Sequence, residues 1–314
     1  MHSVHQDKYA KMTRSAMLAV GVGEVLWDRL PGGDEIGGAP FNVVSHLARL
    51  GYRAAYLTAV GRDPLGDAAI DQMASQGIDT SLVGRADGIP TGLAQVTVAP
   101  GGSPAFVIGR PAAFEHWPAG EPDQVIAMRP AFLVYGTLAQ LRAPARARLA
   151  AIAAGCPGAV ALYDVNLRDG WWSADVVAEL ITLASVVKLS AAEARELAPV
   201  LGVTWSEDAA AVSADLAGRH RLRGVAITAG PDAASLWLDG AFSSAAPPAA
   251  EVVDAVGAGD AFAAGLLDAI GQRRGAAAAL RRANALGTLV ASRRGAQPPW
   301  DPAELSALEA ATRA

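Results

Sequence analysis

Residues 254–262 read DAVGAGDAF, and the interpretation of the rest of the chain depends on this stretch. Small residues fill its middle, and from Phe262 onward apolar residues recur at the 3.6-residue period of a helix. A glycine-rich turn that runs into a helix leaves backbone N–H groups unpaired, and the positive end of the helix dipole adds to their effect. The stretch therefore predicts an anion site at this turn.

Asp260 directly follows these residues, at a place where a bound anion would repel its carboxylate. If the anion is a phosphoryl group in transfer, Asp260 can act as the general base that takes the proton of the attacking hydroxyl. The alternative is an aspartate that only caps the helix. The local sequence leaves both interpretations open, because short glycine motifs are weak evidence.

A second glycine-rich turn, GGAPFN at 37–42, leads into another expected helix that Gly51 ends. This turn carries Asn42 where the first carries an aspartate. A side-chain amide offers both a donor and an acceptor, which suits a polyhydroxylated ligand better than a phosphate. Capping of the helix by Asn42 is the alternative here.

Composition excludes several classes of protein. The 314 residues permit one large α/β domain or two smaller ones, and a net charge of -5 gives no support to binding of nucleic acid or anionic membranes. The lone Cys156 excludes an intrachain disulfide and thiolate zinc clusters. No apolar run approaches the roughly 20 residues that span a bilayer. We expect a disordered extension over residues 1–15, no membrane or nucleic-acid partner, and a cytoplasmic protein.

Expected strands and helices alternate along most of the chain, which predicts a mainly parallel sheet with helices on both faces. A hairpin at 93–98 and 105–108 interrupts this alternation and is typical of a lid or a small separate sheet. Gly21 and Gly23 do not make a dinucleotide fingerprint, because Leu26 stands at the third glycine position. The expected strands are 17–27, 56–61, 132–135, 160–164, 186–189 and 224–228; the expected helices include 67–77, 143–154, 173–184, 191–197, 206–217, 275–293 and 302–311.

Polar residues gather where these strands end. Parallel sheets bind ligands beyond the carboxyl ends of their strands. The residues expected at this edge are Asp28, Asp164, Asn166, Lys188, Glu193, Thr228 and Gly230.

Taken together, these segments resemble the ribokinase-like (PfkB) carbohydrate kinase family, and most closely its bacterial fructokinases, over residues 18–298. Two segments carry most of the resemblance, GGAPFNVVSHLARLG at 37–51 and DAVGAGDAFAAGLL at 254–267. Supporting segments in family order include GEVLWD (23–28), DVNLR (164–168), VKLSAAE (187–193) and RRANALG (281–287).

The resemblance implies one doubly wound α/β kinase domain over 16–314, with a small β-sheet lid formed by about 24–36 and 90–115. In the family such a lid covers the sugar and is often used for dimerisation, so a homodimer is expected. ATP, Mg²⁺ and K⁺ are the implied cofactors.

Matching positions imply the site residues. Asp260 matches the catalytic base and Gly257, Ala258 and Gly259 match the anion hole. The sugar-contacting positions are Asp28, Gly37, Gly38 and Asn42. The nucleotide and phosphate positions are Asn166, Lys188, Glu193, Thr228, Gly230 and Asn284. Glu193 would organise Mg²⁺ through water, and Asp254 would hold the monovalent cation.

The implied activity is transfer of the γ-phosphoryl group of ATP to a primary hydroxyl of a small sugar, with fructose favoured by GEVLWD and GGAPFN. The alternatives are a kinase of 2-keto-3-deoxygluconate, ribose or a nucleoside, and a non-catalytic sugar- or nucleotide-binding homologue. The chain departs from the family pattern at Val165, Ser190, Ala233 and Ala255.

Overall fold

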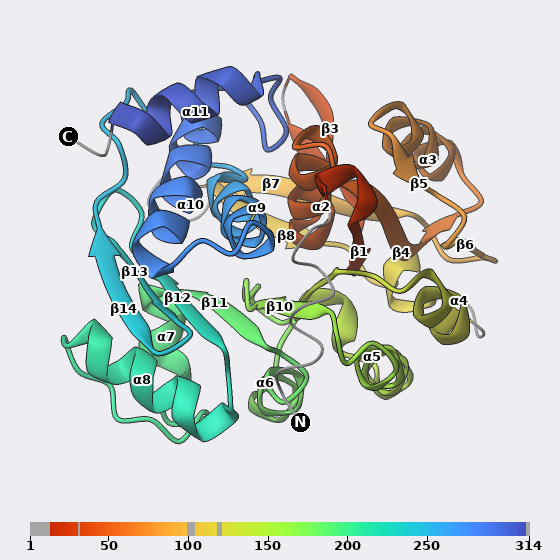
Figure 1. The fold of residues 1–314 in the computed structure, drawn as a ribbon. Coiled ribbons are helices and arrows are strands. Elements are labelled where there is room, and N and C mark those ends of the chain that lie inside the picture. The colour runs from red at the N-terminus through yellow and green to blue at the C-terminus, as the bar shows by residue number, and fades with distance from the viewer. Residues whose placement is uncertain (1–12, 31, 99–103, 118–120, 312–314) are drawn as a thin grey trace.

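A computed structural model describes residues 13–30, 32–98, 104–117 and 121–311 (Figure 1). Its main feature is a ten-stranded sheet with the order β14-β13-β12-β11-β10-β9-β1-β4-β5, in which β6 also pairs with β4. The central strands pair in parallel, and β13 and β14 add an antiparallel edge. These strands are β1 (Leu18–Val22), β4 (Arg53–Gly61), β5 (Ile78–Asp79), β6 (Val83–Ala86), β9 (Phe132–Gly136), β10 (Val160–Asp164), β11 (Val186–Ser190), β12 (Gly224–Thr228), β13 (Ala234–Leu238) and β14 (Ala241–Ala245).

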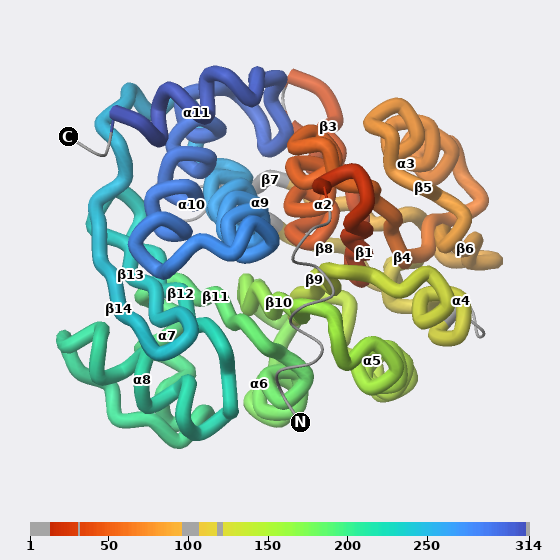
Figure 2. The backbone as a smooth tube through the Cα atoms, in the orientation of Figure 1, coloured from red at the N-terminus to blue at the C-terminus, as the bar shows by residue number. Residues whose placement is uncertain are grey.

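Helices cover both faces of this sheet, as the repeated βα pattern predicts (Figures 1 and 2). One face carries α2 (Ala39–Arg49), α3 (Pro64–Ser75), α9 (Ala258–Gly271) and α10 (Ala276–Ala291), and α11 (Pro302–Ala311) packs on α10. The other carries α4 (Glu121–Met128), α5 (Ala143–Gly155), α6 (Ala174–Ile181), α7 (Ala191–Leu197) and α8 (Ala209–His220). Each face buries its own apolar cluster against the sheet. Within the described residues, no helix is both long enough and apolar enough to cross a bilayer.

A separate four-stranded sheet forms the expected small lid. Its order is β3-β2-β7-β8, with β2 (Leu26–Leu30), β3 (Gly33–Gly37), β7 (Gly92–Val98) and β8 (Pro104–Ile108). The expected turn at 100–103 lies outside the described residues. A third small core that includes Leu26, Phe114 and Trp171 joins the lid to the main body. The guanidinium of Arg110, just past β8, lies 3.7 Å from the ring centroid of Trp171.

The expected single strand at 17–27 is wrong, because the chain divides there into β1 in the main sheet and β2 in the lid. β1 is buried throughout, and so are Leu26 and Trp27 at the start of β2, so the apolar run is nearly continuous and hides the change of sheet. Gly23 to Val25 carry the chain across. Asp28 therefore does not follow a strand of the main sheet: it lies within β2, between Glu35 of β3 and Ala94 of β7.

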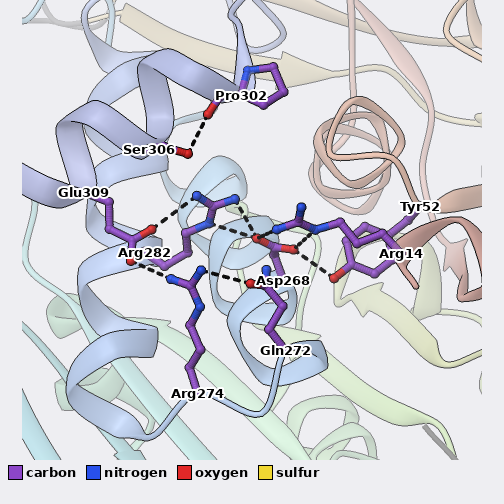
Figure 3. A network of polar contacts seen from close by, with 9 residues as sticks. All are labelled: Arg14, Tyr52, Asp268, Gln272, Arg274, Arg282, Pro302, Ser306 and Glu309. Atoms are coloured by element: carbon purple, nitrogen blue, oxygen red, sulfur yellow. Dashed lines mark hydrogen bonds and ion pairs between the residues drawn. The ribbon is translucent and has the colours of Figure 1, made fainter. Parts of the chain in front are cut away.

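The described residues include the end of the segment 1–15, which was expected to be disordered. Residues 1–12 lie outside the described residues, but Arg14–Ala16 form a 3-10 helix, η1. Arg14 donates two hydrogen bonds to the fully buried carboxylate of Asp268 on α9, at 2.7 and 3.1 Å. Arg282 on α10 and the hydroxyl of Tyr52 donate to the same carboxylate, at 2.8 and 2.9 Å (Figure 3). The polar leader thus contributes a partner for a buried charge, which its composition did not suggest.

Glu309 continues this network to α11, where it accepts from Arg282 at 3.2 Å and from Arg274 (Figure 3). The network ties η1, α9, α10 and α11 together near the end of α9. Its partners hold the pKa of Asp268 below the ordinary value, although burial alone would raise it.

Candidate active site

A cleft of about 280 Å³ lies between the lid and the carboxyl edge of the main sheet. The lid contributes Asp28, Ala94 and Ile108, and the main body contributes both glycine-rich turns and the ends of the central strands. The predicted site residues that line it are Asp28, Gly38, Asn42, Asn166, Lys188, Gly257, Gly259 and Asp260. The structure therefore brings together residues that are more than 200 positions apart in the chain.

The first turn of α9 forms one wall of the cleft. Gly257 is the N-cap residue with φ 75°, and a Cβ there would lie 2.5 Å from Cα of Ala296, so both backbone geometry and space require glycine. The N–H groups of Gly259 and Asp260 have no hydrogen-bond partner among the described residues. Unpaired amides at the positive end of a 14-residue helix suit an anion. Of the predicted amides, that of Ala258 donates to the carbonyl of Ala255 at 3.3 Å, whereas those of Gly257 and Gly259 have no partner among the described residues.

Asp260 does not cap α9, because no side chain caps this helix. Its Oδ2 instead accepts a hydrogen bond from Nδ2 of Asn42, at 2.7 Å. Asn42 does not cap α2 either: the N-cap residue of α2 is Gly38, whose φ of 127° places it outside the range that most residues adopt. Both capping alternatives are thereby wrong. The two glycine-rich turns meet through the side chains that follow them.

Three carboxyl groups line the cleft and hold protons more tightly than usual. Burial, together with the charge of Asp164, raises the pKa of Asp260 to about 7. Burial likewise raises the pKa of Glu24 to about 7 and that of Asp28 to about 6. The positive charge of Arg168 opposes each of these shifts. A carboxyl group with a pKa near neutrality is suited to proton transfer at physiological pH.

Lys188 lies beneath the start of α9 and is paired with Asp164. Its Nζ donates to both carboxylate oxygens of Asp164, at 2.9 and 3.0 Å, and a Cβ placed on Gly259 would lie 3.0 Å from this Nζ. Burial lowers the pKa of Lys188, but the charges of Asp164, Asp260 and Glu193 outweigh it, so the pKa is raised. Lys188 thus keeps its charge next to the anion site.

The remaining predicted residues lie outside the lining of the cleft as far as the structure describes it. Glu193 forms a capping box with Ser190 at the start of α7 and also accepts from the N–H of Leu167, at 2.7 Å. The carboxylate of Asp254 accepts from the N–H groups of Val256 and Gly295, at 3.0 and 2.9 Å.

Thr228 is the last residue of β12, which lies two strands from β10 along the same carboxyl edge, and it pairs in register with Ser190 of β11. Gly230 follows Thr228 by two positions. Asn284 is buried on α10 and donates to the carbonyl of Ala245, at 3.0 Å. Gly37 lies at the end of β3, where a Cβ would come within 2.8 Å of Oδ2 of Asp28.

Glu24 and Arg168 line the cleft but were not assigned a role from the sequence. Oε1 of Glu24 accepts from the N–H of Ala39 at 3.1 Å, whereas Oε2 is buried without a partner in the described residues. A lone carboxylate inside an apolar run was the available signal for Glu24, since such groups are rarely buried without a reason. Arg168 lies two positions beyond Asn166, in a segment whose path only the folded chain reveals.

Unpaired amides at a helix start, a carboxyl group of raised pKa and a cleft beside a small sheet are features expected of a phosphotransferase that acts on a hydroxyl group of a small molecule. Comparison with known proteins agrees with this class. The model of the pfkB family of carbohydrate kinases matches residues 33–303, and the chain belongs to this family.

Fructokinase-1 of Oryza sativa subsp. japonica is 31% identical over 289 residues, which cover 87% of each chain. The solved structure of a fructokinase with bound ATP from Xylella fastidiosa has a TM-score of 0.80 at 25% identity and covers 96% of this chain and 100% of its own. A fructokinase structure from Vibrio cholerae O395, at 24% identity, has the same fold with a TM-score of 0.77 over 93% of this chain and 99% of its own. The protein is therefore a ribokinase-like sugar kinase.

Proposed function

We propose that this sugar kinase transfers the γ-phosphoryl group of ATP to a primary hydroxyl of fructose. The observation that carries the proposal is the position of Asp260, which places a carboxylate of raised pKa directly after the unpaired amides at the start of α9. Its Oδ2 is held by Asn42, which leaves Oδ1 for the sugar hydroxyl.

In the reaction, the sugar oxygen attacks the γ-phosphorus and forms a new P–O bond. The bond from that phosphorus to the β,γ-bridging oxygen breaks, ADP leaves with the electron pair, and the hydroxyl proton passes to Asp260. The unpaired amides of Gly257, Gly259 and Asp260 and the charge of Lys188 stabilise the transferring group, since phosphoryl transfer depends on positioning and charge neutralisation. Closure by the lid excludes water and limits ATP hydrolysis.

The charge of the cleft supports a neutral sugar over an acidic one. Glu24, Asp28 and Asp260 line it, and Arg168 is the cation not committed to a buried ion pair there. A carboxylate-bearing substrate such as 2-keto-3-deoxygluconate would be repelled by this set, whereas hydroxyl groups can donate to it. The match to plant and bacterial fructokinases supports fructose among the neutral sugars. Ribose or a nucleoside is the alternative, and a non-catalytic homologue is disfavoured by the intact Asp260.

ATP would lie along the carboxyl edge from Asn166 and Lys188 toward Thr228, Gly230 and Asn284. The described residues contain no group of three acidic, histidine or cysteine side chains able to hold a metal ion, so Mg²⁺ would be held mainly by the phosphates. Glu193 already accepts three hydrogen bonds, which fits a contact with Mg²⁺ through water rather than direct ligation. Mg²⁺ would supply further charge neutralisation when bound.

Asp254 is proposed to contribute to a K⁺ site beside the anion hole. Its two oxygens each accept one backbone hydrogen bond, which leaves lone pairs for a monovalent cation.

We also propose a cytoplasmic homodimer in which the lids meet. Edge strands β3 and β8 bound the lid sheet, and Val107 on β8 is 56% exposed. Light scattering of the purified protein tests the dimer.

The decisive experiment measures ADP release with MgATP across fructose, ribose, 2-keto-3-deoxygluconate and a nucleoside, with and without K⁺. We expect the highest kcat/KM with fructose. Binding of MgATP and sugar without ADP release would favour the non-catalytic homologue, and a clear preference for another sugar would replace fructose.

A further inference from the structure

Three side-chain amides form a series of hydrogen bonds that ends at the carboxylate of Asp260. Nε2 of Gln76, the C-cap residue of α3, donates to Oε1 of Gln297 at 2.7 Å. Nε2 of Gln297 donates to Oδ1 of Asn42 at 2.6 Å, and Nδ2 of Asn42 donates to Oδ2 of Asp260 at 2.7 Å. In each of these three hydrogen bonds, the donor belongs to the residue that lies farther from Asp260 in the series.

This shared direction follows from the charge of Asp260. An ionised carboxylate only accepts hydrogen bonds, so Asn42 must present Nδ2 to it and Oδ1 to Gln297. If Asn42 were turned over, its oxygen would face the carboxylate and its NH₂ group would face the NH₂ group of Gln297. Hydrogen bonds in series polarise one another, so each amide strengthens the contact that reaches Asp260.

The segment that carries Gln297 is rigidly held. His46 on α2 binds the carbonyl of Ala296 through Nε2 at 3.0 Å, and the indole N–H of Trp300 donates to Nδ1 of the same ring at 3.2 Å. Because indole can only donate, Nδ1 is the acceptor and Nε2 carries the proton. Gly295 is held by Asp254, and Ala296 packs on Gly257. One segment thus supports both the anion hole and the partner of the base.

We infer that Gln297, supported by Gln76, is a positioning residue that keeps the amide of Asn42 turned toward Asp260 and so favours the ionised base. The inference rests on the proposed function of Asp260. Neither glutamine is among the residues that line the cleft, and Gln297 reaches it through its hydrogen bond to Asn42.

Other groups act on Asp260 from the surrounding elements and remain in place in the variants below. They are Asp164 of β10, Lys188 of β11, Arg168 beyond β10, Glu24 beyond β1 and Tyr56 of β4.

Two substitutions separate positioning from packing. Gln297→Met keeps the length of the side chain and removes the donor, so Asn42 is free to turn and to accept from protonated Asp260. Gln297→Glu keeps the shape but presents only acceptors to Asn42, which reverses the hydrogen bond between residue 297 and Asn42 while Gln76 still donates to residue 297. We expect the pKa of Asp260 to rise by about half to one unit in Gln297→Met and by more in Gln297→Glu, the scale of a hydrogen bond to a charged group.

The first measurement does not depend on catalysis. Aspartate labelled with ¹³C at the carboxyl carbon is titrated by NMR in the full chain, and the Asp260 signal is identified by its loss in Asp260→Asn. Gln272→Met is the matched control, because Gln272 is exposed and contacts Arg274 far from the cleft. The pKa of Asp260 should not move in this control. Gln76→Met should give a smaller rise than Gln297→Met, and it replaces that variant if Gln297→Met does not fold.

The second measurement is the pH dependence of kcat/KM. At pH 6 we expect about a 3- to 10-fold loss in Gln297→Met, and at pH 9 a return to within about twofold of the wild type. An equal loss at every pH, or a pKa of Asp260 unchanged in both Gln297 variants, would overturn the inference. If the wild type transfers no phosphoryl group, the NMR titration still decides the positioning role, and only the proposed function fails.

Discussion

Replacement of Asp260 by asparagine tests the proposed base directly. The change keeps the size of the side chain and an oxygen for the Nδ2 donor of Asn42, and it leaves the amides at the start of α9 and Lys188 in place. What is lost is the negative charge of the carboxylate and, with it, proton acceptance. The expected loss in kcat is therefore that of a general base, roughly 10²- to 10⁴-fold, or about 3–5 kcal/mol in the activation barrier.

Stability should move in the opposite direction from activity. Burial raises the pKa of Asp260, which means that the fold disfavours its charged form. A neutral amide should therefore leave the melting temperature at pH 8 unchanged or higher. An activity loss together with an unchanged fold separates a chemical role from a structural one.

The assay couples ADP release to an absorbance change with MgATP and fructose, beside a thermal melt of each variant. Asp215→Asn on α8 is the matched control, since Asp215 forms a surface ion pair with Arg219, and its activity should equal that of the wild type. Turnover of Asp260→Asn within about threefold of the wild type would refute the assignment of the base.

Further predictions concern pH, the anion hole and the buried charges. Because the free enzyme needs Asp260 ionised, kcat/KM should fall about tenfold per unit below pH 7, which an initial-rate profile from pH 5 to 9 would measure. Gly257→Ala should lower kcat roughly 10²-fold or more, because its Cβ would meet Ala296 and displace the amides; unchanged single-turnover rates would contradict this. Asp268→Asn should cost about 3–5 kcal/mol in urea unfolding, against less than about 1 kcal/mol for Asp215→Asn. The pKa of Glu24 is raised from 4.5 to about 7, so its burial reduces stability as pH rises through that range. Glu24→Gln should then be about 1–3 kcal/mol more stable than the wild type at pH 8 and no more stable at pH 4, which chemical denaturation at both pH values would check.

The sequence by itself determined the fold class and the centre of the site. Alternating apolar segments at helix and strand periods require layers of helix and sheet, whatever the details of packing. Glycine-rich turns before α2 and α9 were visible as local patterns, because local backbone geometry restricts which residues can stand there. Gly257 and Asp260 were found in this way.

Tertiary structure alone decided which side chains meet. The split of the run at 17–27 into β1 and β2 was hidden because the start of β2, at Leu26 and Trp27, is as buried as β1. The place of Asp28 in the lid was hidden with it. Whether Asn42 and Asp260 cap their helices or contact each other depends on where α2 lies against α9, a pairing across 218 positions. Gln297 and Arg14 showed no local signal at all. Hydrogen bonds and ion pairs between distant segments form only in the folded chain, and the periodicity of a single segment does not predict them.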